Sequence, residues 1–344
     1  MRTEQETLKA FISCVASYLP ENVLTNEQLA MEYPEWSVEK IYEKTGIRSR
    51  HIASANETCS SMAVNSAKNL FDKNNVLPEQ IDYILLCTQS PDYLLPTTAC
   101  IVQHELDIPT TAGALDFNLG CSGYVYGLSL AKALIESKQA KKVLLLTSEL
   151  YSRYINHNDK SVRTLFGDAA TATLIEGKLS QTEYIHGFQF GTDGKGARNL
   201  IVPHGGSKYP MSNDSRLETE DASGNKRSLS NLYMNGAEIL TFSLKTVPKS
   251  VGKILESANL KQENIERVIF HQANKFMLDK LRIKTGFTEE QFLISYEDYG
   301  NTVSSSIPLG IEKAIKQGKL KNGDKVLVCG FGVGYSWAGC VVEW

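Results

Sequence analysis

The stretch that decides the fold reads Gly113-Ala114-Leu115-Asp116-Phe117-Asn118-Leu119-Gly120-Cys121-Ser122-Gly123. A strand-like run ends in Gly-Cys-Ser-Gly, and the apolar segment 124–135 predicts a long helix that begins there. A thiol at the first turn of a helix faces unpaired N–H groups and the positive end of the helix dipole, which favour the thiolate. The stretch therefore favours an activated nucleophile at Cys121, although free cysteine is also common as a small buried apolar residue.

Composition and charge exclude several classes of protein. The 344 residues are 42% hydrophobic and 22% charged, which is ordinary globular composition. A formal net charge of -3 without a basic run argues against nucleic-acid binding. No apolar run reaches membrane-spanning length, and the first residues carry acids and lack a signal-peptide core. We therefore expect a cytoplasmic protein that binds neither a membrane nor nucleic acid.

The cysteines do not form a recognisable framework. There are seven of them, an odd number, and they are scattered along the chain without a Cys-x-x-Cys pair. This spacing argues against both a disulfide scaffold and a zinc site, and it fits a reducing compartment.

The chain contains an internal repeat. Each copy has a short apolar strand, a Gly-X pair that opens a helix, and a second apolar strand. In the first copy these are residues 81–87, Gly120-Cys121 and residues 142–147. In the second copy they are residues 265–271, Gly300-Asn301 and residues 325–329.

Strands that alternate with helices predict a mostly parallel sheet covered by helices. Two such halves predict a five-layered α/β/α/β/α sandwich with a pseudo-twofold axis. We place the division between residues 1–178, which carry the cysteine, and residues 179–344.

The repeat predicts which side chains meet. Cys121 and Asn301 occupy the same place in the two halves, so the pseudo-twofold axis should bring them together. His271 ends a buried strand at the edge where open α/β sheets place their sites. Taken singly, His271 is more typical of a hydrogen-bonded structural residue and Asn301 of a turn and helix cap. The three together, at equivalent edges, indicate a catalytic centre.

The glycine-rich stretch Gly330-Phe331-Gly332-Val333-Gly334 lies between two predicted strands. This context argues against a dinucleotide-binding loop, which joins a strand to a helix. Two interpretations remain, a tight hairpin or a loop whose N–H groups approach Cys121 and contribute to an oxyanion hole.

The chain resembles the β-ketoacyl-acyl-carrier-protein synthase III family of the thiolase superfamily over nearly its whole length. The resemblance rests on several short motifs that occur in the family's order. They are residues 45–53, Gly120-Cys121-Ser122-Gly123, residues 166–170, Met234-Asn235-Gly236, His271-Gln272-Ala273-Asn274, Gly300-Asn301-Thr302 and residues 330–334.

The resemblance implies a condensing enzyme that initiates fatty acid synthesis. Cys121 would take an acyl group from acyl-CoA as a thioester. His271 and Asn301 would donate hydrogen bonds to the enolate formed when the malonyl group on acyl carrier protein loses carbon dioxide. They would thus serve decarboxylation more than acyl loading. The N–H groups of Cys121 and Val333 would hold the tetrahedral oxyanion. No metal or other cofactor is implied.

The resemblance also implies substrate contacts, a carrier-protein site and a homodimer paired through residues 113–119. The substrate-binding candidates are Asn274, Lys160, Leu95, Phe331 and Gly236. The cations of residues 275–284 predict the docking site, although a solvated helix face would show the same pattern. These cations are Lys275, Lys280, Arg282 and Lys284.

The sequence departs from the family pattern at three positions. Val333 stands where the family often has glycine, and its side chain should crowd the site. Leu95 replaces a frequent aromatic cap of the acyl pocket, which favours primers longer than acetyl. Trp36 lies further from residues 46–48 than the family's adenine-stacking tryptophan. The polar excursion 191–231 predicts either a lid or a plain insertion.

Four rival interpretations can be set against the sequence. A degradative thiolase needs a second cysteine as base and a histidine where this chain has Asn301. A papain-like protease lacks the internal repeat. A non-catalytic scaffold subunit would usually lack Cys121. A specialised acyltransferase or condensing enzyme of secondary metabolism, with an unusual donor or acceptor, stays open.

Overall fold

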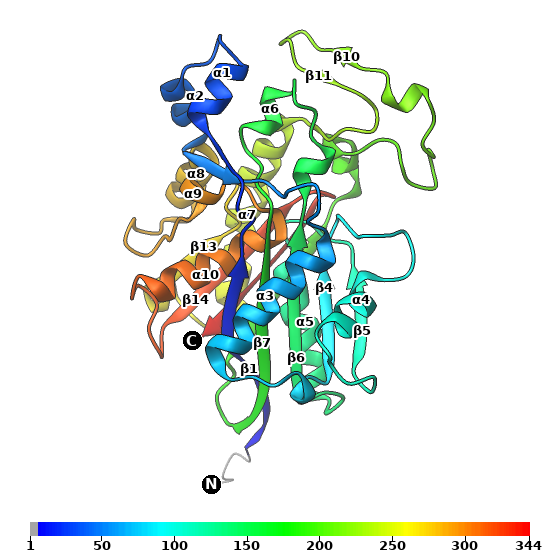
Figure 1. The fold of residues 1–344 in the computed structure, drawn as a ribbon. Helices are drawn as coiled ribbons and strands as arrows, with labels where there is room; N and C mark the ends of the chain where they lie inside the picture. Colours follow the sequence, from blue (N-terminus) through cyan, green and yellow to red (C-terminus); the bar gives the residue numbers. More distant parts are fainter. Residues whose placement is uncertain (1–5) are drawn as a thin grey trace.

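The computed structural model describes residues 6–344. The first half forms a five-stranded sheet with the spatial order β1-β7-β6-β4-β5 (Figure 1). Its strands are β1 (Thr7–Tyr18), β4 (Tyr83–Cys87), β5 (Gly113–Phe117), β6 (Lys142–Glu149) and β7 (Ala169–Ser180). β4 pairs in parallel with β5 and β6, whereas β7 pairs antiparallel with β6 and β1.

The second half repeats this order as β13-β14-β15-β8. Its strands are β8 (Ile185–Thr192), β13 (Arg267–Phe270), β14 (Lys325–Gly332) and β15 (Ser336–Glu343). β13 pairs in parallel with β14, and β15 pairs antiparallel with β14 and β8. A parallel bridge between Val268 and Phe292 stands where β5 stands in the first sheet. The predicted duplication therefore extends to strand order and direction.

The prediction of mostly parallel sheets was wrong, because both sheets are mixed. β14 and β15 are joined by a short turn at residues 333–335, and such a turn connects antiparallel neighbours. β6 and β7 are also antiparallel. The segment between them holds only a 3₁₀ turn (Tyr151–Tyr154) and the short α6 (Lys160–Arg163), with no helix long enough to cross a sheet face.

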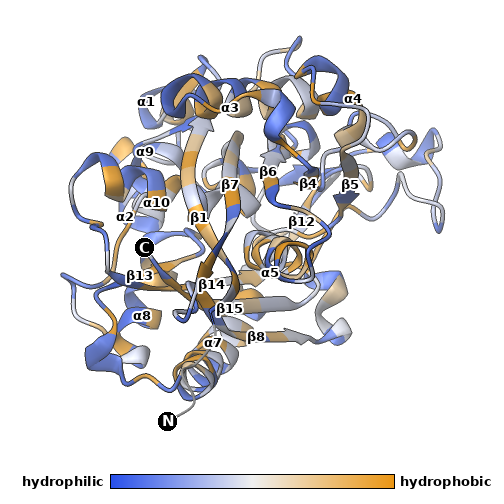
Figure 2. Cartoon of the chain, turned by 90° about the horizontal axis from the view of Figure 1, so that it is seen from below, coloured by the Kyte–Doolittle hydropathy of each residue, from blue (hydrophilic) through white to orange (hydrophobic). Residues whose placement is uncertain are grey.

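Helices separate and cover the two sheets in five layers (Figure 2). α3 (Cys59–Asn74) and α4 (Thr98–Glu105) pack on the outer face of the first sheet. α5 (Gly123–Glu136) and α10 (Ser306–Lys316) lie between the sheets. α7 (Gly236–Ala258) packs on the outer face of the second sheet, with α8 (Lys275–Thr285) against it. This arrangement confirms the predicted five-layered sandwich.

The sequence of α5 explains its central position. Tyr124, Leu128, Ala131 and Ile135 are fully buried on one face of the helix, and Val125 and Gly127 in its first half are buried as well. A helix that is apolar on most sides is typical of a core element. α5 contacts strands of both sheets, so the residues that precede it are placed at the centre of the molecule.

The remaining elements are short and lie around the carboxyl ends of the central strands. They are β2 (Val23–Thr25), α1 (Asn26–Glu32), α2 (Val38–Thr45), β3 (Ser49–His51), β9 (Leu200–Ile201), β10 (Thr219–Glu220), β11 (Lys226–Arg227), β12 (Tyr233–Met234) and α9 (Tyr296–Tyr299).

The excursion 191–231 is anchored on the segment before α6. Arg227 Nε lies 2.7 Å from Asp159 Oδ2, and Asn156 donates to Glu218. In Figure 1 the β10–β11 hairpin extends beyond the body of the molecule near α6. The division of the chain at residues 178 and 179 stays a prediction. No helix within residues 6–344 is long and apolar enough to cross a membrane.

Candidate active site

A small cavity of about 70 Å³ brings Cys121, His271 and Asn301 together. The pseudo-twofold relation between the two halves predicted this meeting. Most of the other side chains around the cavity are apolar and come from both halves and from the excursion. They include Leu165, Phe166, Leu200, Met234, Ile239 and Met277.

Cys121 is 4% exposed and lies two residues before α5, whose N-cap is Ser122. It therefore precedes the first turn of the helix, one position earlier than a capping residue. The end of β14 passes directly over it. A Cβ atom at Gly330 would lie 2.3 Å from the carbonyl oxygen of Cys121, and one at Gly332 would lie 2.8 Å from its Sγ. These two glycines are required because any side chain there would displace the cysteine.

The environment of Cys121 holds it as a thiol. Burial raises the pKa of Cys121 to about 12, and the carboxyl group of Glu149 acts in the same direction. The N–H groups of Cys121 and Val333 lower this pKa without outweighing burial. The N–H groups favour the thiolate, as the sequence predicts, but desolvation penalises the charged form more. The thiol must lose its proton during the reaction.

His271 follows β13 and is turned toward the cavity by Ser306. Its Nδ1 lies 2.8 Å from Ser306 Oγ, and Ser306 Oγ donates to the carbonyl oxygen of Val303 at 2.9 Å. The hydroxyl hydrogen is thus engaged, so Nδ1 carries the ring proton and Nε2 is left as an acceptor. Burial lowers the pKa of His271 to about 3, so the ring is neutral at physiological pH.

Asn301 is oriented by its own backbone surroundings. Its Oδ1 accepts from the N–H of Val303 at 3.0 Å, which leaves Nδ2 as the free donor. The N–H of Asn301 donates to Leu165, and its carbonyl oxygen accepts from Gly167. These bonds place the side chain across the boundary between the halves, where the two N–H hydrogens of Nδ2 can serve a substrate oxygen.

The predicted oxyanion-hole pair converges on the sulfur, since the N–H groups of Cys121 and Val333 both lie within reach of Sγ. The Val333 side chain lies beside Gly120, the residue before Cys121. A Cβ atom at Gly120 would lie 2.6 Å from Val333 Cγ1. Val333 therefore packs against Gly120 and lines a neighbouring cavity of about 340 Å³ together with Gln89. Val333 is therefore not among the residues that line the cavity of Cys121.

Three of the five predicted substrate residues line the cavity of Cys121: Asn274, Gly236 and Phe331. Asn274 caps α8 by accepting from Met277 N–H at 3.0 Å, so its amide nitrogen is free. The Phe331 ring stands edge-on to His271, with centroids 5.7 Å apart.

Lys160 and Leu95 do not line this cavity in the single chain. Lys160 Nζ lies 2.6 Å from Glu35 Oε1, an ion pair that ties α6 to the segment between α1 and α2. Leu95 is 82% exposed in the loop between β4 and α4. A role for either residue depends on a bound substrate or a second subunit.

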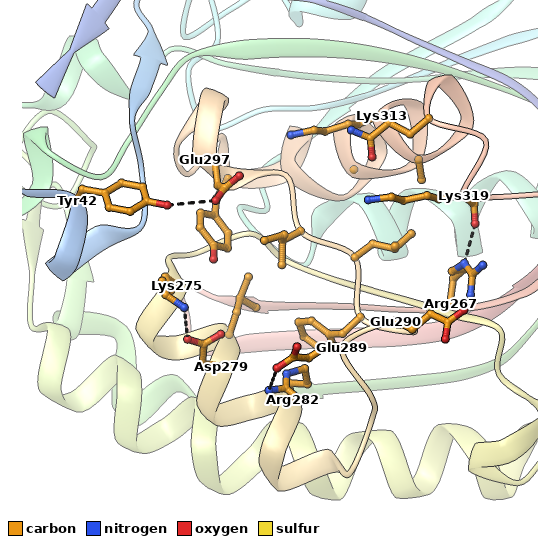
Figure 3. Close-up of a pocket in the computed structure, with 18 residues that line it drawn as sticks. Tyr42, Arg267, Lys275, Asp279, Arg282, Glu289, Glu290, Glu297, Lys313 and Lys319 are labelled. Carbon is orange, nitrogen blue, oxygen red and sulfur yellow. Dashed lines mark hydrogen bonds and ion pairs between the residues drawn. The ribbon is translucent and has the colours of Figure 1, made fainter.

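The four cations predicted to dock a carrier protein do not form one patch. Lys275 pairs with Asp279 at 2.7 Å, and Arg282 pairs with Glu289 at 3.0 Å. Both cations face a separate cavity of about 650 Å³ between α8 and α10, which does not include Cys121 (Figure 3). Lys280 and Lys284 lie on another side of α8, where the Lys280 ammonium lies 4.7 Å from the centroid of the exposed Phe276 ring.

Sequence reasoning missed the apolar wall of the cavity and the buried carboxyl group of Glu149. The wall residues come from segments far apart in the chain, and nothing in their local pattern distinguishes them from ordinary core. Glu149 did leave a signal, because it ends the apolar run of β6 with a charged residue.

Comparisons with known proteins agree on one family. The family model described as 3-oxoacyl-[acyl-carrier-protein] synthase III matches residues 115–194, and that of its C-terminal part matches residues 255–344. The β-ketoacyl-[acyl-carrier-protein] synthase III of Lactococcus lactis is 38% identical over 336 residues, which cover 97% of this chain and 99% of that protein. The protein of the same name from Caldanaerobacter subterraneus is 34% identical over 342 residues, 98% and 99% of the two chains.

A crystal structure of a 3-oxoacyl-(acyl-carrier-protein) synthase III superimposes with a TM-score of 0.96 and 53% identity, covering 98% of this chain and 100% of that one. Fold and relatives together define a condensing enzyme, an acyltransferase of the thiolase superfamily. The chain belongs to the β-ketoacyl-acyl-carrier-protein synthase III family, the condensing enzymes of fatty acid initiation.

Proposed function

We propose that the chain loads an acyl group from acyl-CoA onto Cys121 and condenses it with malonyl-acyl-carrier-protein. The observation that carries this proposal is the shared cavity of Cys121, His271 and Asn301, in which an acceptor nitrogen and a donor amide are both free. Incubation with a panel of acyl-CoAs, followed by intact-protein mass measurement and then by malonyl-carrier-protein, tests both half-reactions.

In the acyl-transfer step, Nε2 of His271 takes the proton of the Cys121 thiol as the sulfur attacks the thioester carbonyl of acyl-CoA. The N–H groups of Cys121 and Val333 hold the oxyanion that forms. When this intermediate collapses, the departing CoA sulfur takes the proton back from the imidazolium. Acyl-Cys121 and free CoA result, and His271 is neutral again.

In the condensation step, the malonyl thioester oxygen needs donors as carbon dioxide leaves. Nδ2 of Asn301 is one donor. His271 becomes the other when its proton moves to Nε2, with the Ser306 hydroxyl turning from Val303 to donate to Nδ1. The enolate carbon then attacks the thioester carbonyl of acyl-Cys121, the bond between that carbonyl and the sulfur breaks, and the β-ketoacyl-carrier-protein forms. Cys121 leaves as a thiolate and takes one proton from solvent, which restores the resting thiol. The chemistry draws on these side chains and needs no metal or redox group.

We further propose a cytoplasmic homodimer. All seven cysteines are free, which suits a reducing compartment. β5 is an edge strand of the first sheet, so its outer backbone groups are available for pairing. The loop before α4 exposes Leu94 at 93% and Leu95 at 82%. Leucines this exposed are typical of a surface that a partner covers, and a second subunit is the route by which Leu95 could reach a site.

Replacing Leu94 with aspartate should weaken the dimer, because a charge would be buried at the proposed interface. We expect a monomer mass by light scattering at micromolar concentration, where the wild type gives twice that mass. Leu77→Asp is the matched control, since Leu77 is 57% exposed in the loop before β4. A monomeric wild type, or a Leu94→Asp protein that dimerises as the wild type does, would contradict the proposal.

Acyl carrier protein is the proposed partner at the Lys280 side of α8. Phe276 and Ile283 are exposed there, and Lys280 and Lys284 stand among them without an acidic partner in the described structure. An exposed apolar surface rimmed by cations suits an acidic, partly apolar protein, and it would raise the association rate in a salt-dependent way. Asn274 at the start of the same helix lines the cavity of Cys121.

The double variant Lys280→Glu/Lys284→Glu should raise the Michaelis constant for malonyl-carrier-protein by about tenfold at low salt, as expected when two attractive charges become repulsive. The Michaelis constant for acyl-CoA should stay close to that of the wild type. Lys275→Glu/Arg282→Glu is the control on the other side of α8. An unchanged Michaelis constant for malonyl-carrier-protein, or an equal change in the control variant, would contradict the proposal. This side of α8 would then be an ordinary solvated face.

A further inference from the structure

A buried carboxyl group stands behind the nucleophile and has no role in the steps above. Glu149 ends β6 and is 0% exposed. Its Oε2 lies 3.0 Å from the backbone nitrogen of Gln89, and its Oε1 lies 2.7 Å from Ser304 Oγ. No lysine, arginine or histidine forms an ion pair with Glu149 within residues 6–344.

The hydrogen-bond partners of Glu149 belong to opposite sides of the catalytic centre, with Gln89 and Ser90 on one side and Ser304 on the other. Gln89 lies in the first half, beside the nucleophile loop. A Cβ atom at Gly120 would lie 2.7 Å from its Oε1, which also accepts from Tyr151 at 2.5 Å. Ser304 lies in the second half, in the 3₁₀ turn (Val303–Ser305) whose first N–H orients Asn301. Glu149 thus joins the loop behind Cys121 to the segment that carries Asn301.

The surroundings of Glu149 oppose a negative charge. The groups that face it are acids or weak acids from several elements, and none is a base. They are Asp168 just before β7, Cys87 on β4, Cys59 on α3, Cys121, Tyr151 and Tyr154. Burial raises the pKa of Glu149 to about 8, against the stabilising hydrogen bonds of Ser304 and Gln89. The group is therefore mostly protonated at neutral pH.

We propose that Glu149 is a positioning residue that works as a neutral carboxylic acid, joining the Gln89 loop to the Asn301 segment without placing a charge beside Cys121. Its carbonyl oxygen accepts from Gln89 N–H. Ser304 Oγ donates to Oε1 of the carboxylate, and in the proposed neutral acid this bond reverses, so that the Glu149 O–H donates to Ser304 Oγ. The hydroxyl of Ser304 also lies within hydrogen-bond reach of the Cys87 thiol, which can take its hydrogen. Both oxygens of the acid and the serine are then satisfied without a cation.

The proposal has a pH consequence with a defined sign. Above about pH 8 the acid ionises, and a carboxylate then stands near two sites where negative charge must form, the Cys121 sulfur and the enolate held by Asn301. Like charges raise each other's energy, so both steps should slow as pH rises through this range. The turnover number should therefore fall on the alkaline side, and the Michaelis constants should change little.

Glu149→Gln tests whether the neutral acid or the carboxylate is the working form of residue 149. A glutamine amide has the shape of the protonated acid, accepts from Gln89, donates to Ser304, and cannot ionise. We expect Glu149→Gln to lose the alkaline fall in turnover number. Glu149→Ala and Ser304→Ala should lower turnover number at every pH, because the join to the Asn301 segment is broken. Glu312→Gln is the matched control, as Glu312 is another buried carboxyl group, on α10.

A second readout does not depend on condensation. Alkylation of Cys121 by iodoacetamide at pH 9, followed by peptide mass, should be about tenfold faster in Glu149→Gln than in the wild type, the change that one unit in the pKa of the thiol would give. The proposal rests on the function proposed above, and this readout distinguishes the two, because Cys121 can be alkylated whether or not acyl-CoA is the substrate.

Two results would overturn the proposal. In the first, Glu149→Gln is as inactive as Glu149→Ala, which would mean that the carboxylate is the working form. In the second, Glu149→Gln keeps both the alkaline fall and the wild-type alkylation rate, which would mean that Glu149 does not act on Cys121. If Glu149→Ala does not fold, Ser304→Ala supplies the comparison.

Discussion

Replacing Cys121 with serine should abolish acyl transfer from acyl-CoA, lowering its rate by at least about a thousandfold, as the loss of a nucleophile does in other covalent enzymes. The serine hydroxyl is a much weaker acid than a thiol. His271 therefore removes the serine proton less readily than the thiol proton, and the serine oxygen is the weaker nucleophile. Wild type should gain one acyl mass on the peptide that contains Cys121.

The control for this experiment is Cys100→Ser. Cys100 is an exposed free thiol on α4, and it is the residue that non-specific acylation would reach first. This variant should be acylated at the wild-type rate. A Cys121→Ser protein that still acquires the acyl group at that rate, or a label found on Cys100, would refute the assignment of the nucleophile.

Removing the amide donor at residue 301 should separate the two half-reactions. Asn301→Ala should lower carbon dioxide release from malonyl-carrier-protein by about 100- to 1000-fold, the usual effect of deleting one oxyanion donor. Acylation of Cys121 should stay within about threefold of wild type, because its oxyanion is held by backbone N–H groups that the substitution does not remove.

Asn301→Asp separates the orientation of the side chain at residue 301 from its ability to donate a hydrogen bond. Its carboxylate can still accept from Val303 N–H, the bond that orients Asn301, but it has no N–H to donate. It should fail in decarboxylation like Asn301→Ala. His271→Ala should lose decarboxylation to a similar degree and acylation to a smaller one, since Nε2 also takes the thiol proton in the proposed mechanism. Equal loss of both half-reactions in the Asn301 variants would refute this division of labour.

The sequence by itself determined the duplicated fold and the three residues that meet at its centre. The spacing of apolar residues and the continuous apolar runs predict the individual strands and helices. The same order of these elements in the two halves of the chain implies a pseudo-twofold axis. Residues at equivalent strand and helix ends then converge, as Cys121 and Asn301 do. The N–H of Val333 was implied only by the family resemblance, because the glycine-rich stretch by itself left a plain hairpin open, and the structure brings this N–H to the Cys121 sulfur.

Strand direction, ionisation and side-chain orientation were decided only by the tertiary structure. Whether two neighbouring strands are antiparallel depends on how the segment between them returns to the sheet. The apolar runs in the sequence carry no information about this return. The pKa of Cys121 is raised because the chain buries it under β14, and local sequence shows only the helix start that opposes this. The ring proton of His271 is placed by Ser306, 35 residues away in the chain.

Only the tertiary structure decided how the cations of α8 are grouped and what surrounds Glu149. Whether Lys275 and Lys280 share a face depends on the turn of α8 and on which acids reach it, so a run of cations in sequence became two separate groups. Glu149 joins Gln89 and Ser304, which come from different halves of the chain. Burial and hydrogen bonding are set by neighbours that only folding brings together, and these set the charge state of every group at the site.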